Sequence, residues 1–150
     1  MNWNFLFSTD KNNWAALITR LTIGFVLFPH GAQKLFGWFG GYGFTGTMGF
    51  FTGMMHLPWI VGFLVIIIES IGCLALIAGF ATRLCSLAVL GEFIGIIFTV
   101  HIKYGYFMNW AGLPNAGEGI EYHLLIIGLC LAALITGGGK WSTDSFLMKK

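Results

Sequence analysis

Four long apolar segments, separated by stretches rich in glycine, aromatic and turn-forming residues, dominate the pattern of the chain. They cover residues 14–37, 58–80, 84–103 and about 120 to 136. The first three approach or exceed the ~20 residues that an α-helix needs to cross the ~30 Å hydrocarbon layer of a bilayer, and the fourth is somewhat shorter. The pattern therefore predicts an all-α fold, a bundle of four transmembrane helices that forms a single domain over residues 1–150.

The first apolar segment carries its charges on one face. Five residues at steps of four, three, four and three share that face: Arg20, Gly24, Leu27, Gly31 and Lys34. His30 lies one turn before Lys34 on the same side, and Pro29 is expected to kink the helix just before it. Glycines let a neighbouring helix approach closely, and charges in a bilayer need partners or access to the interface. This face is therefore predicted to point at the other helices.

The later segments supply carboxylates for these cations. Glu69 lies near the middle of the second segment, Glu92 within the third and Glu121 at the start of the fourth. We expect Glu69 to contact the first helix directly or through water. Arg20 and Lys34 can each reach part of the way, with Lys34 favoured if Pro29 bends that helix inward. Arg20, Arg83 and Glu92 are candidates for structural ion pairs that hold the bundle together.

Helical spacing predicts the inward faces of the remaining segments. In the second segment the face comprises Gly62, Glu69, Gly72, Leu76 and Gly79; in the third Cys85, Ala88, Glu92, Gly95 and Thr99; in the fourth Glu121, Gly128 and Ala132. His101 follows Glu92 by nine residues, which at ~100° each place it half a turn away. Either the helix loosens before His101 or the histidine faces a different neighbour.

Two connections are aromatic and rich in glycine. Residues 36–57 are too apolar for an ordinary exposed loop and too rich in glycine for a regular helix, so they are expected to lie in the membrane interface or to fold back over the bundle. Residues 104–119 combine aromatic residues with turn formers. Both connections are predicted on the outer side of the membrane.

The basic residues predict the orientation of the chain. With four spans, the two termini and the middle turn share one side, and five cations fall there: Lys11, Arg83, Lys140, Lys149 and Lys150. Basic residues favour the cytoplasmic side, so both termini are predicted to be cytoplasmic, with Trp3 and Trp14 at headgroup depth.

Composition agrees with a multi-pass membrane protein, since 57% of residues are hydrophobic, 9% are charged and the mean hydropathy is +0.80. A net charge of +2 gives no reason to expect a nucleic-acid partner. The three cysteines, Cys73, Cys85 and Cys130, form no motif, and no metal site is expected. The expected surroundings are the lipid bilayer, with a homodimer as one candidate assembly.

Several pieces of the chain resemble one family. They are Arg20-Leu21, His30-Gly31 with Lys34-Leu35, the stretch GWFGGYGFTGT, Glu69 with Gly72, Gly79 before Thr82-Arg83-Leu84, His101, and Gly119 with Glu121-Tyr122. From residue 17 to residue 144 the chain looks like a DoxX family membrane protein. The resemblance implies a four-helix bundle in a bacterial inner membrane. It also implies a link to quinol oxidase or thiosulfate:quinone oxidoreductase subunits, and to complexes with redox partner proteins.

These residues support several functional hypotheses. A redox-linked subunit could bind a quinone with His30 or His101 as hydrogen-bond donors, Lys34 as a cation and Glu69 or Glu121 as proton carriers. The alternatives are that the charges only lock the bundle, that it binds or transports a small molecule or lipid, or that it anchors a partner enzyme. Haem between His30 and His101 is disfavoured, because His101 points away from the inward face predicted for its helix.

Overall fold

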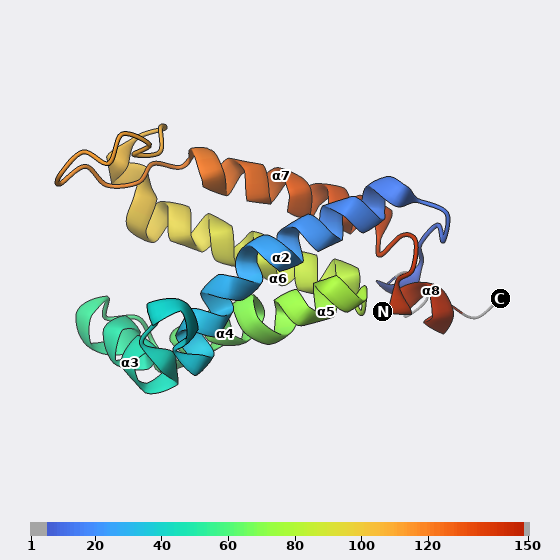
Figure 1. Cartoon of the computed structure of the whole chain (residues 1–150), viewed down its shortest axis with the longest axis horizontal. Coiled ribbons are helices and arrows are strands. Elements are labelled where there is room, and N and C mark those ends of the chain that lie inside the picture. Colours follow the sequence, from blue (N-terminus) through green and yellow to red (C-terminus); the bar gives the residue numbers. More distant parts are fainter. Residues whose placement is uncertain (1–5, 149–150) are drawn as a thin grey trace.

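The structure, a computed structural model that describes residues 6–148, consists of helices and their connections (Figure 1). The fold class is confirmed as all-α, since no strand occurs among those residues. The predictions for Trp3, Lys149 and Lys150 lie outside the described residues.

Three continuous helical stretches are long and apolar enough to cross a membrane. The first is α2, Trp14–Phe36, which runs through Pro29 as one helix. The second comprises α4 (Trp59–Ile67), η3 (Ile68–Gly72) and α5 (Cys73–Ala78), and the third comprises α6 (Thr82–Ile96), η4 (Ile97–His101) and η5 (Ile102–Tyr104). A fourth apolar helix, α7 (Glu121–Thr136), has 16 residues and rises about 24 Å, which is less than the thickness of the hydrocarbon layer.

One apolar core joins these helices. Its buried members come from all four stretches: Ile23, Leu27, Cys73, Leu76, Val89, Phe93, Ile126, Cys130 and Ala133. The face predicted for the first helix is present, because Arg20, Gly24, Leu27 and Gly31 are all buried in α2. The cations and glycines of the first segment therefore face protein.

The inward faces predicted for the third and fourth segments need correction. In α6 the buried residues are Thr82, Arg83, Ser86, Val89 and Phe93, and in α7 they are His123, Ile126, Cys130 and Ala133. Gly95, Thr99 and Gly128, which were expected inside, are exposed. Larger apolar side chains such as Val89 and Phe93 fill the space between the helices, because a close-packed core needs their volume.

Residues 36–57 are mostly helical, which corrects the expectation that they form no regular helix. They contain η1 (Trp38–Gly40), α3 (Gly43–Gly49) and η2 (Phe50–Met54). Met48 and Phe51 pack with Ile66 of α4 in a second buried cluster. This tertiary contact outweighs the low helix propensity of the glycines, and the segment folds back against the second helical stretch.

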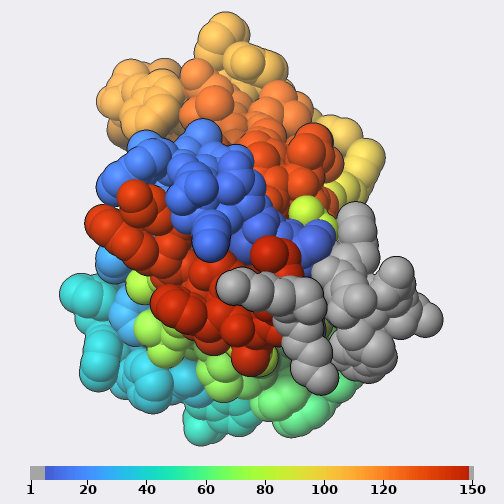
Figure 2. Space-filling model, turned by 90° about the vertical axis from the view of Figure 1, so that its right-hand side faces the viewer, coloured from blue at the N-terminus to red at the C-terminus, as the bar shows by residue number. Residues whose placement is uncertain are grey.

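The opposite end of the molecule is closed by the segment after α7. This segment includes α8 (Thr143–Leu147) and lies beside the start of α2 and over the end of α5 (Figure 2). The backbone N–H of Lys140 donates to the carbonyl of Asn13 at 3.1 Å, and the N–H of Asp144 donates to the carbonyl of Gly79 at 2.9 Å. The Asp144 carboxylate also accepts hydrogen bonds from the N–H groups of Ala81 and Thr82, which caps α6.

Arg20 is held by this closing segment, which corrects its expected ion pairing with a carboxylate. The side chain is 1% exposed, and its guanidinium donates to backbone carbonyls on two segments: Leu76 and Ile77 at the end of α5, and Gly138, Lys140 and Trp141 after α7. Five donors in a planar group suit several carbonyl acceptors at once. Arg83 similarly donates to the Ser8 hydroxyl and to the Ile135 carbonyl.

Candidate functional site

An ion pair between Lys34 of α2 and Glu69 of η3 lies at the centre of the candidate site. The expected contact of Glu69 with the first helix is therefore present. Gly31 allows it, because a side chain there would collide with the backbone carbonyl of Glu69. Glu69 is 5% exposed and sits in a π-helical turn, a feature that inserts a residue into a helix and often occurs at functional sites.

Two cavities meet at this ion pair. The first, which we call the site cavity, has a volume of about 300 Å³ and is lined by Leu27, His30, Lys34, Glu69, Phe93, Ile96, His101, Met108, Glu118, Tyr122 and His123. The second, the side cavity, has a volume of about 430 Å³ and is mainly apolar, with walls from η2, α4 and the end of the third helical stretch. Lys34, Glu69 and Ile96 line both. The ion pair therefore separates two hollows at one end of the bundle.

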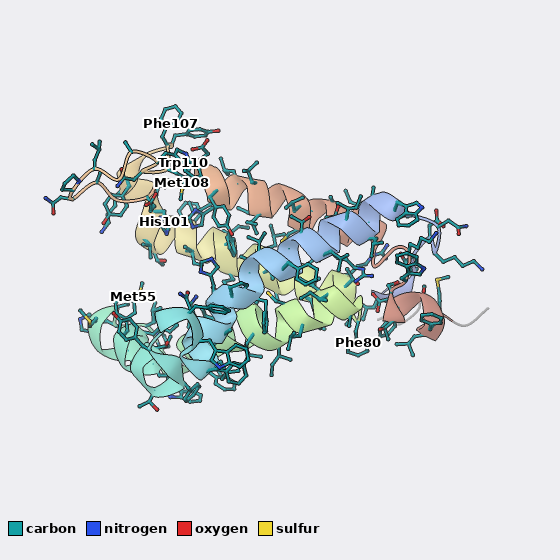
Figure 3. All side chains as sticks on the ribbon, viewed as in Figure 1. Met55, Phe80, His101, Phe107, Met108 and Trp110 are labelled. Carbon is teal, nitrogen blue, oxygen red and sulfur yellow. The ribbon has the colours of Figure 1, made fainter. Side chains whose placement is uncertain are left out.

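His101 reaches the site cavity because its helix changes pitch. Residues Ile97–His101 form the π-helical segment η4, and each such turn adds a residue that rotates the rest of the helix by roughly 100°. Of the two alternatives for His101, the loosened helix is the one present. Its ring centroid lies 4.1 Å from that of His123, and its Nδ1 lies 2.7 Å from the Glu118 carbonyl oxygen. In Figure 3, His101 and Met108 lie on the α6 side of this end, opposite Met55.

Two further polar residues of the site cavity come from the start of α7. His123 is 5% exposed and packs against His101, and the buried hydroxyl of Tyr122 has no hydrogen-bond partner in the described part of the chain. Both were absent from the candidates chosen from sequence. The signals for them were their position next to Glu121 and the Glu121-Tyr122 motif, but the inward face predicted for this helix lay nearly opposite the observed one.

The candidates divide into those that line the site cavity and those that do not. His30, Lys34, Glu69 and His101 line it, although His30 is otherwise exposed. Glu121 does not: its carboxylate accepts hydrogen bonds from the Met108 N–H at 3.2 Å and the Trp110 indole N–H at 3.3 Å. Glu121 thus ties residues 105–120, which border the site cavity, to the first turn of α7.

Glu92 lies behind Glu69 and not beside a cation of its own. Its carboxyl group interacts with that of Glu69, and both of its oxygens are buried without a hydrogen-bond donor among residues 6–148. Its expected structural ion pair is therefore replaced by a group of two carboxyls around one lysine. No cluster of three or more metal-binding side chains occurs in residues 6–148.

The arrangement combines the features that a site for a small polar-headed ligand requires. Apolar walls from Leu27, Phe93 and Ile96 surround hydrogen-bond donors and acceptors, and a charge pair lies at the floor. Such a mixture of a mostly apolar lining and a few converging polar groups is typical of binding pockets. The polar groups can hold a ligand carbonyl or hydroxyl and can exchange a proton with it.

Comparison with known proteins agrees with the resemblance seen in the sequence. The chain is 30% identical over 133 residues to a protein of Bacillus subtilis (strain 168) called "Putative oxidoreductase CatD". The aligned region covers 89% of this chain and 87% of that protein. No solved structure matches the chain. The family model described as DoxX matches residues 15–102, which is more than half of the sequence. The chain therefore belongs to the DoxX family, and it carries helices suited to a membrane.

Proposed function

We propose that this DoxX family membrane protein is a subunit of a redox-linked system of the bacterial inner membrane and that it binds a quinone or quinol in the site cavity. One observation carries the proposal: Tyr122 lines the mostly apolar site cavity, and its buried hydroxyl has no hydrogen-bond partner among residues 6–148. Buried polar groups in native proteins are normally satisfied. A ligand oxygen in the site cavity would satisfy this one.

The cavity fits a quinone in shape and chemistry. A quinone is a flat apolar ring with two carbonyl oxygens, so it needs apolar walls and a donor for each oxygen. Phe93, Ile96 and Met108 provide such walls, and residues with hydrogen-bond donors from two helices line the same space: His30 and Lys34 of α2 and Tyr122 of α7. A volume of about 300 Å³ lies at the lower end of the range for small-molecule pockets.

The residues of the site would hold the ligand and move protons. Reduction of a quinone to a quinol takes up two electrons and two protons, and the electrons would come from a redox partner protein. Tyr122 would donate to a carbonyl oxygen of the quinone. His101 donates its Nδ1–H to the Glu118 carbonyl, so its Nε2 would accept from a quinol hydroxyl. Glu69, next to Lys34, would relay protons to the ligand oxygens. The name of the Bacillus subtilis relative supports a redox setting.

The proposed placement in the membrane has four spans, with α7 as the fourth. The start of α2 and α8 lie at one end of the molecule, and α3 and residues 105–120 lie at the other (Figure 1). The basic residues Lys11, Arg83 and Lys140 belong to the first end, which we assign to the cytoplasm. The site cavity would then open towards the outer side.

Binding of decylubiquinone to the purified protein in mild detergent, followed by isothermal titration calorimetry, tests the proposal. We expect saturable binding to one site. Tyr122→Phe should weaken it about fivefold to tenfold, since a lost hydrogen bond to the ligand costs about 1 kcal/mol.

Tyr42→Phe is the matched control, because Tyr42 is exposed and lies outside the site cavity. It should leave the affinity unchanged. An equal effect of the two substitutions, or the absence of saturable binding, would contradict a quinone site here. Mass spectrometry of molecules that copurify with the protein would then distinguish a lipid from another small molecule.

A further inference from the structure

We propose that Glu92 and Glu69 together bind one proton beside Lys34, and that this proton is the one passed to a ligand in the site cavity. The delivery to a quinone rests on the proposed function. The bound proton does not, because it follows from the protein's own charges and hydrogen-bond donors.

Three side chains from three helical stretches make up this proton site: Lys34 of α2, Glu69 of η3 and Glu92 of α6. Lys34 forms the ion pair with Glu69. The Glu92 carboxyl interacts with the Glu69 carboxyl and with the charge of Lys34. Glu69 lines both cavities, whereas Glu92 lines neither. Glu92 therefore lies behind Glu69 as seen from a bound ligand.

Counting donors shows that Glu92 is not a plain carboxylate. Both of its oxygens are buried, and no N–H or O–H group of the described chain donates to either. A buried carboxylate without donors costs several kcal/mol, and such a group normally takes up a proton instead. Two ionised carboxylates cannot bond to each other, but one proton between them creates an O–H···O hydrogen bond.

Counting charges gives the same answer. Glu69 and Glu92 share one cation, Lys34, so a single proton makes the group of three neutral. The titratable groups that act on the two carboxyls besides Lys34 are Cys73, Cys130 and Tyr122, and none of these carries a positive charge. Lys103 and three histidines (His30, His101 and His123) also line the cavities that Glu69 borders. Within the described residues none of them forms an ion pair or hydrogen bond with either carboxyl. Arg20 cannot supply the second positive charge in place of the proton, because its guanidinium is bound to the carbonyls of Gly138 and Leu76 at the opposite end of the bundle.

The proton can move towards the ligand in two balanced steps. The Glu92 carboxyl transfers its proton to the carboxylate of Glu69, which leaves Glu92 as the carboxylate. Glu69 then gives that proton to a ligand oxygen in the site cavity, and the group of three is left with a net charge of −1. A proton from water must restore it before the next transfer.

Infrared spectroscopy of the ligand-free protein in detergent at neutral pH tests the bound proton directly. A protonated carboxyl has a C=O stretching band, separate from the carboxylate bands, that shifts in D₂O. We expect one such carboxyl in the wild type and none in Glu92→Gln, where Glu69 remains ionised beside Lys34. Glu69→Gln should also remove the band, since Glu92 then ionises as the partner of Lys34.

A third substitution should increase the number of protonated carboxyls instead of reducing it. Lys34→Met removes the cation, so both carboxyls should be protonated and the band should double. Asp10→Asn is the control, because it makes the same kind of change at an exposed carboxylate and should leave the band unchanged. Thermal melts of each variant establish that it is folded.

The result can be read independently of quinone binding. A wild type without the band, or a band that persists undiminished in Glu92→Gln, would overturn the bound proton whatever the titration with decylubiquinone shows. A band that changes as expected across the variants would support the bound proton even in a protein that binds no quinone.

Discussion

Gly31 of α2 touches the backbone of Glu69 in η3. A Cβ placed on Gly31 would lie well within 3.0 Å of the Glu69 carbonyl, a separation that real Cβ atoms do not show. This contact brings two helix backbones together one turn before Lys34. The absence of a side chain at residue 31 is thus the reason that Lys34 can reach Glu69.

Gly31→Ala should destabilise the protein by about 3 kcal/mol or more, because neither helix backbone can move without disturbing the core. It should also separate Lys34 from Glu69. The melting temperature followed by circular dichroism in detergent measures the first effect.

Gly128→Ala in α7 provides the control for this prediction, since a Cβ at that position meets open space. It should leave the melting temperature unchanged or raise it, because alanine favours a helix over glycine by up to ~1 kcal/mol. Equal melting temperatures for the two variants would show that the contact at Gly31 does not hold the helices.

Arg20→Lys should lower stability by roughly 3–5 kcal/mol although the charge is kept. An ammonium group has three donors around one point and cannot serve carbonyls that surround a planar guanidinium on two segments. The segment after α7 should then detach first, so limited proteolysis should cut near residues 138–141 before it cuts elsewhere.

Lys11→Arg is the reference for this change, because Lys11 is exposed and the substitution again exchanges the two basic side chains. It should alter neither the melting temperature nor the cleavage pattern. Cleavage of Arg20→Lys at the same sites and rates as the wild type would rule out the clamp formed by Arg20.

Replacing Cys73, Cys85 and Cys130 together with alanine should preserve the fold and ligand binding. All three are free thiols and two are fully buried, so each loses only a small packing side chain, at a cost of about 1 kcal/mol. Calorimetric titration and thermal melts check this. A folded triple variant that no longer binds decylubiquinone would contradict this prediction and show that at least one thiol takes part in ligand binding.

A reporter that is active only in the periplasm should stay silent when fused after residue 150. The same reporter inserted within residues 111–116, which are exposed, should be active. The physical reason is the cluster of basic residues Lys11, Arg83 and Lys140 at the other end of the molecule. The opposite pattern would reverse the orientation, and activity at both positions would show that α7 does not cross the membrane.

The sequence was most informative where a charge and a glycine kept a strict helical spacing. The buried face of α2 and the approach of Lys34 to Glu69 could be predicted because charges in a bilayer need partners and few carboxylates lie within the later segments. The same reasoning failed for Arg20, because backbone carbonyls of a distant segment serve it and side-chain spacing carries no signal for them.

The site was only partly predictable because two helices change pitch inside it. Glu69 and His101 both lie in π-helical segments, and an inserted residue shifts the phase of all later residues in the helix. A uniform 100° step therefore placed His101 away from the bundle. In α7 the predicted inward face lay nearly opposite the observed one and so missed Tyr122 and His123, since apolar residues surround the helix on all sides and give little contrast.

The contacts of Arg20 with residues 138–141 also set an order of events during synthesis. The first helix leaves the ribosome more than a hundred residues before the carbonyls that its guanidinium finally binds. Until then that charge must be solvated by water or lipid headgroups, so the first helix enters the bilayer with a temporary partner. Residues 138–141, which are translated after α7, complete the burial of a charge in the first helix, and assembly of this end of the bundle has to wait for them.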